Sequence, residues 1–180
     1  MRLILVRHPQ PQVAPGLCYG STDLAVAPEE LARALADLTS RLPQDVPLFS
    51  SPLRRCAGLA AVLAYPAFEL DARLAELDFG DWEMRPWDAI ERAEIDAWAD
   101  DMAGYRPGGG ESVLQMAARV AAFHDALLRK QTSCAIVICH AGTMRLLAAR
   151  HAGLSCEAMA LQAAREPHAI AYGETLILDS

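Results

Sequence analysis

Two short apolar runs, one near each end of the chain, constrain its fold most strongly. Residues 3–6 read Leu-Ile-Leu-Val and stop at Arg7-His8, and residues 135–139 read Ala-Ile-Val-Ile-Cys and stop at His140. Short apolar runs of this kind are typical of buried strands in a parallel sheet. The carboxyl ends of such strands face the ligand crevice in open α/β folds. We therefore expect Arg7, His8 and His140 to meet at one site, although they lie far apart in the sequence.

The rest of the chain alternates helix and strand patterns. Ser50-Ser51-Pro52 predicts a serine-capped helix start, and Ser112 predicts the cap of a long helix. This alternation predicts an α/β fold, a three-layer α/β/α sandwich with a mostly parallel central sheet. The 180 residues predict one domain over 1–180. Strands are expected over 2–7, 46–49, 68–70, 134–139, 169–172 and 175–178, the last two as a hairpin or as edge strands, and helices over 28–41, 53–64, 86–103, 112–130, 142–152 and 157–162.

Composition excludes several classes of protein. The net charge of −7 gives no basic face for nucleic acid, and no apolar run approaches the roughly 20 residues that span a bilayer. We therefore expect neither a nucleic-acid nor a membrane partner. The N-terminus shows no signal-peptide pattern, and the five cysteines lack C-x-x-C spacing, which predicts reduced thiols and a cytoplasmic location. An anionic substrate would have to be bound by local arginines, because the overall charge repels it.

One such arginine pair follows the second predicted strand, in Ser51-Pro52-Leu53-Arg54-Arg55. The free amides and the dipole of a helix N-terminus attract anions, and an arginine in the first turn adds a bidentate phosphate contact. The alternative is a solvated pair of surface arginines.

A segment over residues 74–83 combines acidic and aromatic residues, Leu-Ala-Glu-Leu-Asp-Phe-Gly-Asp-Trp-Glu. Burial beside Phe79 and Trp82 would raise the pKa of a carboxyl group and provide a proton donor. The alternative is a loop with solvated acids and two anchoring aromatic side chains. The residues alone do not choose among the four carboxylates, Glu76, Asp78, Asp81 and Glu83.

Two further patterns point away from nucleotide and metal sites. Gly108-Gly109-Gly110 lacks the lysine and the spacing of a P-loop, so we interpret it as a turn before the long helix. The other three histidines show no metal-ligand spacing, so we expect no metal site and no cofactor; they are His124, His151 and His168.

Taken together and in this order, five motifs resemble the histidine phosphatase superfamily, whose members have the phosphoglycerate mutase-like fold. They are Leu-Val-Arg-His, Ser-Ser-Pro-Leu-Arg-Arg-Cys, Arg-Leu-Ala-Glu-Leu-Asp-Phe-Gly-Asp-Trp-Glu, Gly-Gly-Glu-Ser-Val and Ile-Cys-His-Ala-Gly. The resemblance implies a phosphomonoester hydrolase that uses a phosphohistidine and needs no metal ion. It implies that His8 is the nucleophile, Glu76 the general acid and His140 the second pocket histidine. Arg7 and Arg55, rather than Arg54, would bind the phosphate.

The segment Gly16-Leu17-Cys18-Tyr19-Gly20-Ser21-Thr22-Asp23 is similar to a stretch of α-ribazole phosphatases, which act in cobalamin nucleotide-loop assembly. It implies α-ribazole 5′-phosphate as substrate, with Tyr19, Gly20, Thr22 and Ala141 beside the phosphate. Pro9 and Met84 depart from the family pattern, which has glycine there, and Pro11 follows nearby. A broad-specificity or sugar-phosphate phosphatase, a protein phosphohistidine phosphatase and a non-catalytic phospho-ligand binding module remain alternatives, and a homodimer stays open.

Overall fold

The computed structural model describes residues 1–165 and 169–179, from which a five-stranded sheet and six α-helices form. Short 3-10 helices, at Ala72–Leu74, Gly80–Trp82, Trp87–Ala89 and Pro107–Gly109, connect some of these elements. None of the described helices has the length and apolar character needed to cross a membrane. The elements are β1 (Arg2–Arg7), α1 (Pro28–Thr39), β2 (Leu48–Ser50), α2 (Arg54–Val62), β3 (Phe68–Leu70), α3 (Arg92–Asp100), α4 (Val113–Arg129), β4 (Cys134–Cys139), α5 (Ala141–His151), α6 (Cys156–Arg165) and β5 (Thr175–Leu178).

The sheet brings the two ends of the chain together. Its strand order is β3-β2-β4-β1-β5, and all neighbouring pairs are parallel except β1 with β5. β1 and β4 pair in register, with Arg7 opposite Cys139. Because the strands are parallel, His8 and His140 follow them at the same edge of the sheet. The predicted meeting of these two histidines is confirmed.

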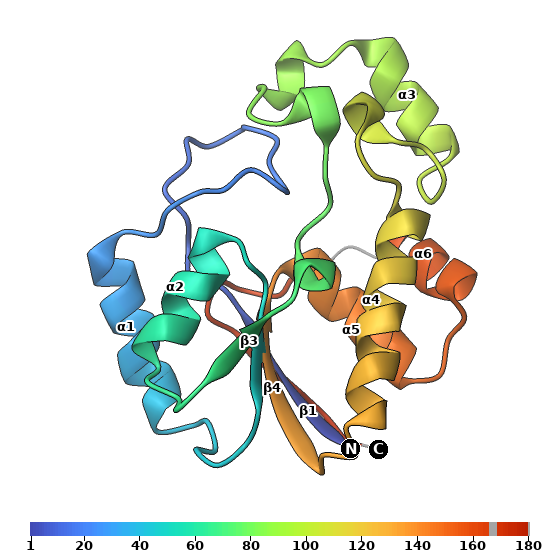
Figure 1. Cartoon of the computed structure of the whole chain (residues 1–180). Coiled ribbons are helices and arrows are strands. Elements are labelled where there is room, and N and C mark those ends of the chain that lie inside the picture. Colours follow the sequence, from blue (N-terminus) through green and yellow to red (C-terminus); the bar gives the residue numbers. More distant parts are fainter. Residues whose placement is uncertain (166–168, 180) are drawn as a thin grey trace.

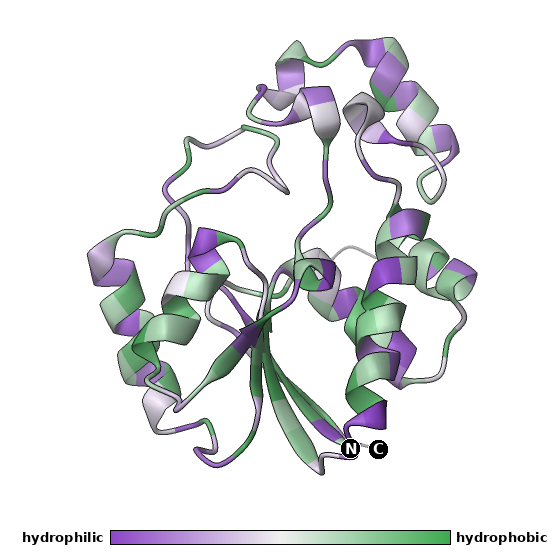
Figure 2. Ribbon diagram, viewed as in Figure 1, coloured by the Kyte–Doolittle hydropathy of each residue, from purple (hydrophilic) through white to green (hydrophobic). Residues whose placement is uncertain are grey.

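Helices cover both faces of the sheet, so the predicted three-layer α/β/α sandwich is confirmed (Figure 1). The alternation of side chains along β1 builds the two cores: Leu3 and Leu5 pack toward α4 and α5, whereas Ile4 and Val6 pack toward α1 and α2. Hydrophobic residues concentrate on the central strands in Figure 2, as burial on both faces requires.

A cap of short helices extends beyond the carboxyl ends of the strands, at the top of Figure 1. It spans about residues 79–110 and contains α3. Its small core forms around Trp82, which is fully buried and packs with Cys18, Ile90 and Tyr105. The cap therefore has its own packing and closes over the edge of the sheet that carries the histidines.

The serine cap predicted for the second helix is wrong. α2 begins at Arg54, and Leu53 is its N-cap residue. The Ser51 hydroxyl lies 2.8 Å from Nε2 of His140 and 3.4 Å from the backbone nitrogen of Leu53. The serine side chain is thus committed to the histidine rather than to the helix end. The preceding strand also starts later than predicted, at Leu48.

The single helix predicted over 86–103 is wrong in its first part. Trp87–Ala89 is a short 3-10 helix, and α3 begins only at Arg92. Between them, Ile90 has an extended backbone with φ −83° and ψ 133°. It is 6% exposed and packs against Trp82. Burial of Ile90 in the cap core outweighs the helical preference of its neighbours.

The strand predicted over 169–172 is also wrong, because this segment makes contacts across the end of β1 instead of pairing along a strand. The Ile170 carbonyl accepts a hydrogen bond from Nη1 of Arg7 over 2.5 Å. Gly173, at φ 75°, then turns the chain into β5. Its N–H donates to the Arg7 carbonyl over 3.2 Å, which fixes the turn beside the site.

Candidate active site

His8 lies at the carboxyl edge of the sheet and is 2% exposed. Its Nδ1 lies 2.7 Å from the carbonyl oxygen of Pro9. Because a carbonyl oxygen only accepts hydrogen bonds, Nδ1 carries the ring proton and donates it to Pro9. The lone pair of the neutral ring is then on Nε2, and Nε of Arg55 donates to it over 3.3 Å. Pro9 thus contributes a carbonyl group where it cannot contribute an amide.

Arg55, in the first turn of α2, links the two histidines and is fully buried. Its Nε lies 3.3 Å from Nε2 of His8 and 3.2 Å from Nδ1 of His140. Its Nη1 and Nη2 donate to the carbonyls of Thr22 and Gly20, over 2.8 Å and 2.5 Å. Two of the expected substrate-binding residues, Gly20 and Thr22, thereby fix the guanidinium in place. Arg54, in contrast, is exposed.

His140 is the N-cap residue of α5 and is fully buried. Since Arg55 donates to its Nδ1, the ring proton of a neutral His140 is on Nε2. That nitrogen lies 2.8 Å from the Ser51 hydroxyl, and Sγ of Cys56 lies 3.5 Å from it. The orientation of His140 is therefore fixed from two sides.

Both site histidines are neutral at neutral pH. Burial, together with the positive charge of Arg55, lowers the pKa of His8 to about 3. The same two causes lower the pKa of His140 well below its usual value. A neutral imidazole keeps the lone pair that a nucleophile requires.

Arg7 packs against Tyr172, one of two tyrosines whose hydroxyl groups contact each other. Its guanidinium carbon lies 3.9 Å from the ring centroid of Tyr172, whose ring centroid is 5.6 Å from that of His8. The hydroxyl groups of Tyr172 and Tyr19 are 2.7 Å apart. Tyr19 was predicted from the sequence as a substrate-binding residue, whereas Tyr172 was not. The signal that could have found it is β5, because an antiparallel strand beside β1 must begin next to His8.

Glu76 lines the cavity that His8, Arg7 and Arg55 also line, and it lies in the chain between two of the short 3-10 helices. Its Oε2 accepts a hydrogen bond of 3.0 Å from the backbone N–H of Gly142, in the first turn of α5. A Cβ atom at position 142 would overlap the Glu76 carboxyl group, so glycine permits this approach. Burial raises the pKa of Glu76. A carboxyl group of this kind can hold a proton and donate it.

The other three acids of this segment have different surroundings. Asp81 is exposed, and Asp78 is exposed while accepting from the Ser21 hydroxyl over 3.0 Å. Glu83 is half-buried; burial opposes its ionisation, but its hydrogen bonds outweigh this and lower its pKa. Of the four, Glu76 lines the cavity beside His8. The Glu83 carboxylate accepts from the side-chain hydroxyls of Ser21 and Thr22 and from the backbone amides of Gly20, Ser21, Thr22 and Phe79.

The cavity beside His8 has a volume of about 640 Å³ and combines two kinds of lining. The polar part includes Arg7 and His8 at the sheet edge, Arg55 from α2 and Glu76 from the segment after β3. Ala141, at the start of α5, also lines this part of the cavity. The apolar part comes largely from the cap. The indole rings of Trp87 and Trp98 stack there, with planes 8° apart and centroids separated by 6.1 Å. The apolar lining includes Leu17, Phe79, Trp87, Trp98, Met102 and Met116.

Within residues 1–165 and 169–179, no three His, Cys, Asp or Glu side chains converge as a metal site would require. His124 and His151 contact each other between α4 and α5, with Nε2 of the first 3.2 Å from Nδ1 of the second. His168 lies outside the described residues.

The chain is similar to known proteins in sequence and in fold. The model of the histidine phosphatase superfamily (branch 1) matches residues 3–170. The adenosylcobalamin/α-ribazole phosphatase of Escherichia coli (strain K12) is 32% identical over 168 residues, which covers 88% of this chain and 83% of the relative. The crystal structure of the α-ribazole phosphatase from Shigella flexneri superposes with a TM-score of 0.82 at 26% identity, over 99% of this chain and 90% of that one.

A mycobacterial glucosyl-3-phosphoglycerate phosphatase in complex with VO3 shares the fold, with a TM-score of 0.79 at 23% identity over 99% of this chain and 92% of that one. The family match spans both apolar strands, both site histidines and the segment that carries Glu76. The chain therefore belongs to the histidine phosphatase superfamily.

Proposed function

We propose that this phosphatase hydrolyses α-ribazole 5′-phosphate through a phosphohistidine at His8. The observation that carries the catalytic part is the hydrogen bond from His8 Nδ1 to Pro9, which leaves the lone pair of a neutral ring on Nε2. Phosphatases among the relatives support the reaction class.

In the first half of the reaction, Nε2 of His8 attacks phosphorus as the bond to the ester oxygen breaks. Arg7 and Arg55 stabilise the charge on the phosphoryl oxygens, which is where most catalysis of phosphoryl transfer arises, and His140 orients Arg55 by accepting its Nε–H. Glu76 gives its proton to the leaving oxygen, so the first product departs as an alcohol and Glu76 becomes a carboxylate.

In the second half, the Glu76 carboxylate takes a proton from water while the water oxygen attacks the phosphorus of phosphohistidine. The P–N bond breaks, inorganic phosphate leaves, and both His8 and Glu76 return to their starting states. The sum is one ester and one water converted to one alcohol and one phosphate. We propose that no metal ion takes part, since Arg7 and Arg55 supply the positive charge.

The apolar part of the cavity supports the choice of substrate. α-Ribazole is a nucleoside with a flat, apolar benzimidazole base, and the rings of Phe79, Trp87 and Trp98 line the cavity beside the phosphate end. Offset or edge contacts between aromatic rings contribute about 0.5–1.5 kcal/mol beyond the area that they bury. Two of the relatives reported above are α-ribazole phosphatases by name.

The proposal is tested by comparing hydrolysis of α-ribazole 5′-phosphate and p-nitrophenyl phosphate by wild type and His8→Ala, with and without EDTA. A His8-dependent preference for α-ribazole 5′-phosphate that survives EDTA is expected. Activity on the aryl ester without that preference would favour a broad-specificity or sugar-phosphate phosphatase. Phosphate binding without turnover of either ester would favour a binding module.

Two further predictions concern the cellular location of the protein and its oligomeric state. We propose a cytoplasmic enzyme, because its five cysteines are all free thiols, as a reducing compartment would maintain them. A homodimer remains a prediction, which the molar mass in solution would test.

A further inference from the structure

The segment that carries Glu76 is held by side chains from outside it. Residues 75–79 form neither helix nor strand, so the backbone here lacks the repeating hydrogen bonds of a regular element. A general acid nevertheless has to be aligned to within hydrogen-bond reach of the leaving oxygen. Some other part of the molecule must therefore fix this backbone.

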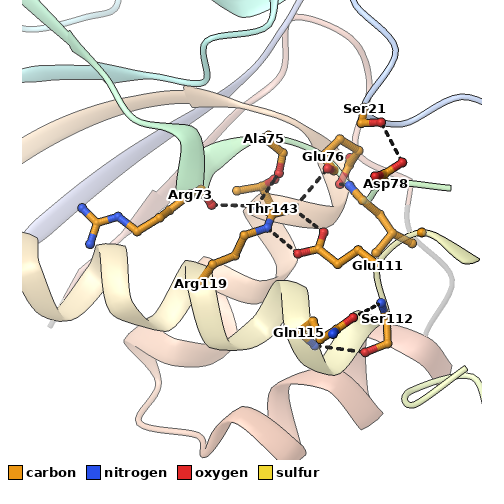
Figure 3. A network of polar contacts seen from close by, with 12 residues as sticks. Ser21, Arg73, Ala75, Glu76, Asp78, Glu111, Ser112, Gln115, Arg119 and Thr143 are labelled. Carbon is orange, nitrogen blue, oxygen red and sulfur yellow. Dashed lines mark hydrogen bonds and ion pairs between the residues drawn. The ribbon is translucent and has the colours of Figure 1, made fainter. Parts of the chain in front are cut away.

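Arg119, on α4, makes the closest set of contacts to this backbone (Figure 3). Its Nη1 donates to the carbonyls of Arg73 and Ala75, both over 2.7 Å. Its Nη2 donates to the carbonyl of Glu76 itself over 3.1 Å. One guanidinium thus binds three carbonyl groups within four consecutive residues, while its side chain is 21% exposed.

Glu111 fixes the guanidinium in turn. Its two carboxylate oxygens accept from Nε and Nη2 of Arg119, each over 2.7 Å, which is a bidentate ion pair. The backbone N–H of Glu111 donates to the carbonyl of Asp78 over 2.8 Å. Glu111 directly precedes Ser112, the N-cap residue of α4, which forms a capping box with Gln115. Arg119 and Glu111 therefore hold the acidic segment by hydrogen bonds to its backbone on both sides of Glu76.

We propose that Arg119, oriented by Glu111, is a positioning residue that aligns the Glu76 carboxyl group for proton transfer. The inference rests on the proposed function, in which Glu76 protonates the leaving oxygen. A misplacement of about 1 Å can cost roughly a hundredfold in rate. The hydrogen bonds of Arg119 described above do not involve Arg7, His8 or Arg55, so we expect these phosphate-binding groups to keep their positions when Arg119 is lost.

The test uses Arg119→Gln and Arg119→Lys, with Arg129→Gln as the matched control. Arg129 is an exposed arginine in the last turn of the same helix. For each variant, kcat and KM are measured on p-nitrophenyl phosphate, which has a good leaving group, and on glycerol phosphate, which has a poor one. The inhibition constant of inorganic phosphate reports on the phosphate-binding groups.

We expect Arg119→Gln to lower kcat on glycerol phosphate at least tenfold more than on the aryl ester, with the inhibition constant of phosphate unchanged within twofold. Arg119→Lys keeps the charge but cannot bind three carbonyls and a carboxylate together, so it should show the same bias. Full rescue by lysine would overturn the inference, because charge alone would then suffice. Equal losses on both esters would overturn it as well.

Glu76→Gln separates failure of this inference from failure of the proposed function. If Glu76→Gln selectively impairs the poor leaving group and Arg119→Gln does not, the acid role stands and the positioning role falls. If Glu76→Gln impairs both esters equally, both fall. If Arg119→Gln does not fold, Glu111→Gln tests the same positioning role, because it removes the carboxylate that orients the Arg119 guanidinium. In a protein that already carries Glu76→Gln, adding Arg119→Gln should not further lower kcat on glycerol phosphate relative to kcat on the aryl ester.

Discussion

Acid should destabilise this protein through His8. The ring titrates near pH 6.5 when it is free in water, whereas burial and Arg55 lower its pKa in the folded protein to about 3. Below pH 6.5 the unfolded chain takes up a proton at His8 that the folded protein excludes. The titration of His8 therefore costs no stability above pH 6.5, and it lowers the free energy of unfolding progressively as the pH falls from 6.5 toward 3.

The size of the effect follows from the difference in pKa. At pH 5 the unfolded chain lies 1.5 units below its pKa and the folded protein is still unprotonated at His8, so the loss is about 2 kcal/mol. His8→Gln removes this titration, and its amide group can still donate to the Pro9 carbonyl. His140 is present in both proteins, so its own contribution largely cancels in the comparison.

The assay is urea unfolding of wild type and His8→Gln at pH 7 and pH 5. Wild type should lose about 2 kcal/mol more of its free energy of unfolding than the variant between these two values. An equal loss in both proteins would mean that His8 titrates normally in the folded state. His8 would then not be held neutral by burial and by Arg55.

Three other substitutions test separate parts of the account. Arg55→Lys should lower kcat/KM roughly a hundredfold, because one ammonium group cannot bind two carbonyls and two imidazoles, whereas steady-state kinetics of Arg54→Lys should match wild type. Glu83→Gln should reduce the free energy of unfolding by about 1–3 kcal/mol, since its amide would face backbone N–H donors. Asp81→Asn is the control in the same urea titration, and an equal effect there would contradict this reading of Glu83. Trp98→Ala should raise KM for α-ribazole 5′-phosphate by up to roughly tenfold but leave KM for glycerol phosphate unchanged. An equal change in both KM values would mean that the cap does not recognise the base of the substrate.

The parts of the fold that depend on local patterns were predictable. The apolar runs of β1 and β4 and the parallel layers follow from the hydrophobic pattern, and they already place His8 and His140 together. The Ser112 cap and its long helix follow from local chemistry in the same way.

The parts that depend on distant contacts were not predictable. Ile90 interrupts a helical pattern because it is buried in the core of the cap. Ser51 does not cap α2, because its hydroxyl contacts His140 instead. Tyr172 reaches Arg7 only because β5 pairs with β1. Arg119 shows no motif of its own, since its three carbonyl partners lie more than forty residues earlier in the chain. Such contacts join segments whose proximity is created by the complete fold.

The most direct test of the central claim is to trap the phosphorylated enzyme. The protein is mixed rapidly with α-ribazole 5′-phosphate, quenched under alkaline conditions that preserve phosphohistidine, and analysed by intact and peptide mass spectrometry beside His8→Ala. The account predicts one phosphoryl group per wild-type chain, located on His8, and none on the variant. A phosphoryl group on another residue, or turnover by His8→Ala at the wild-type rate, would contradict it.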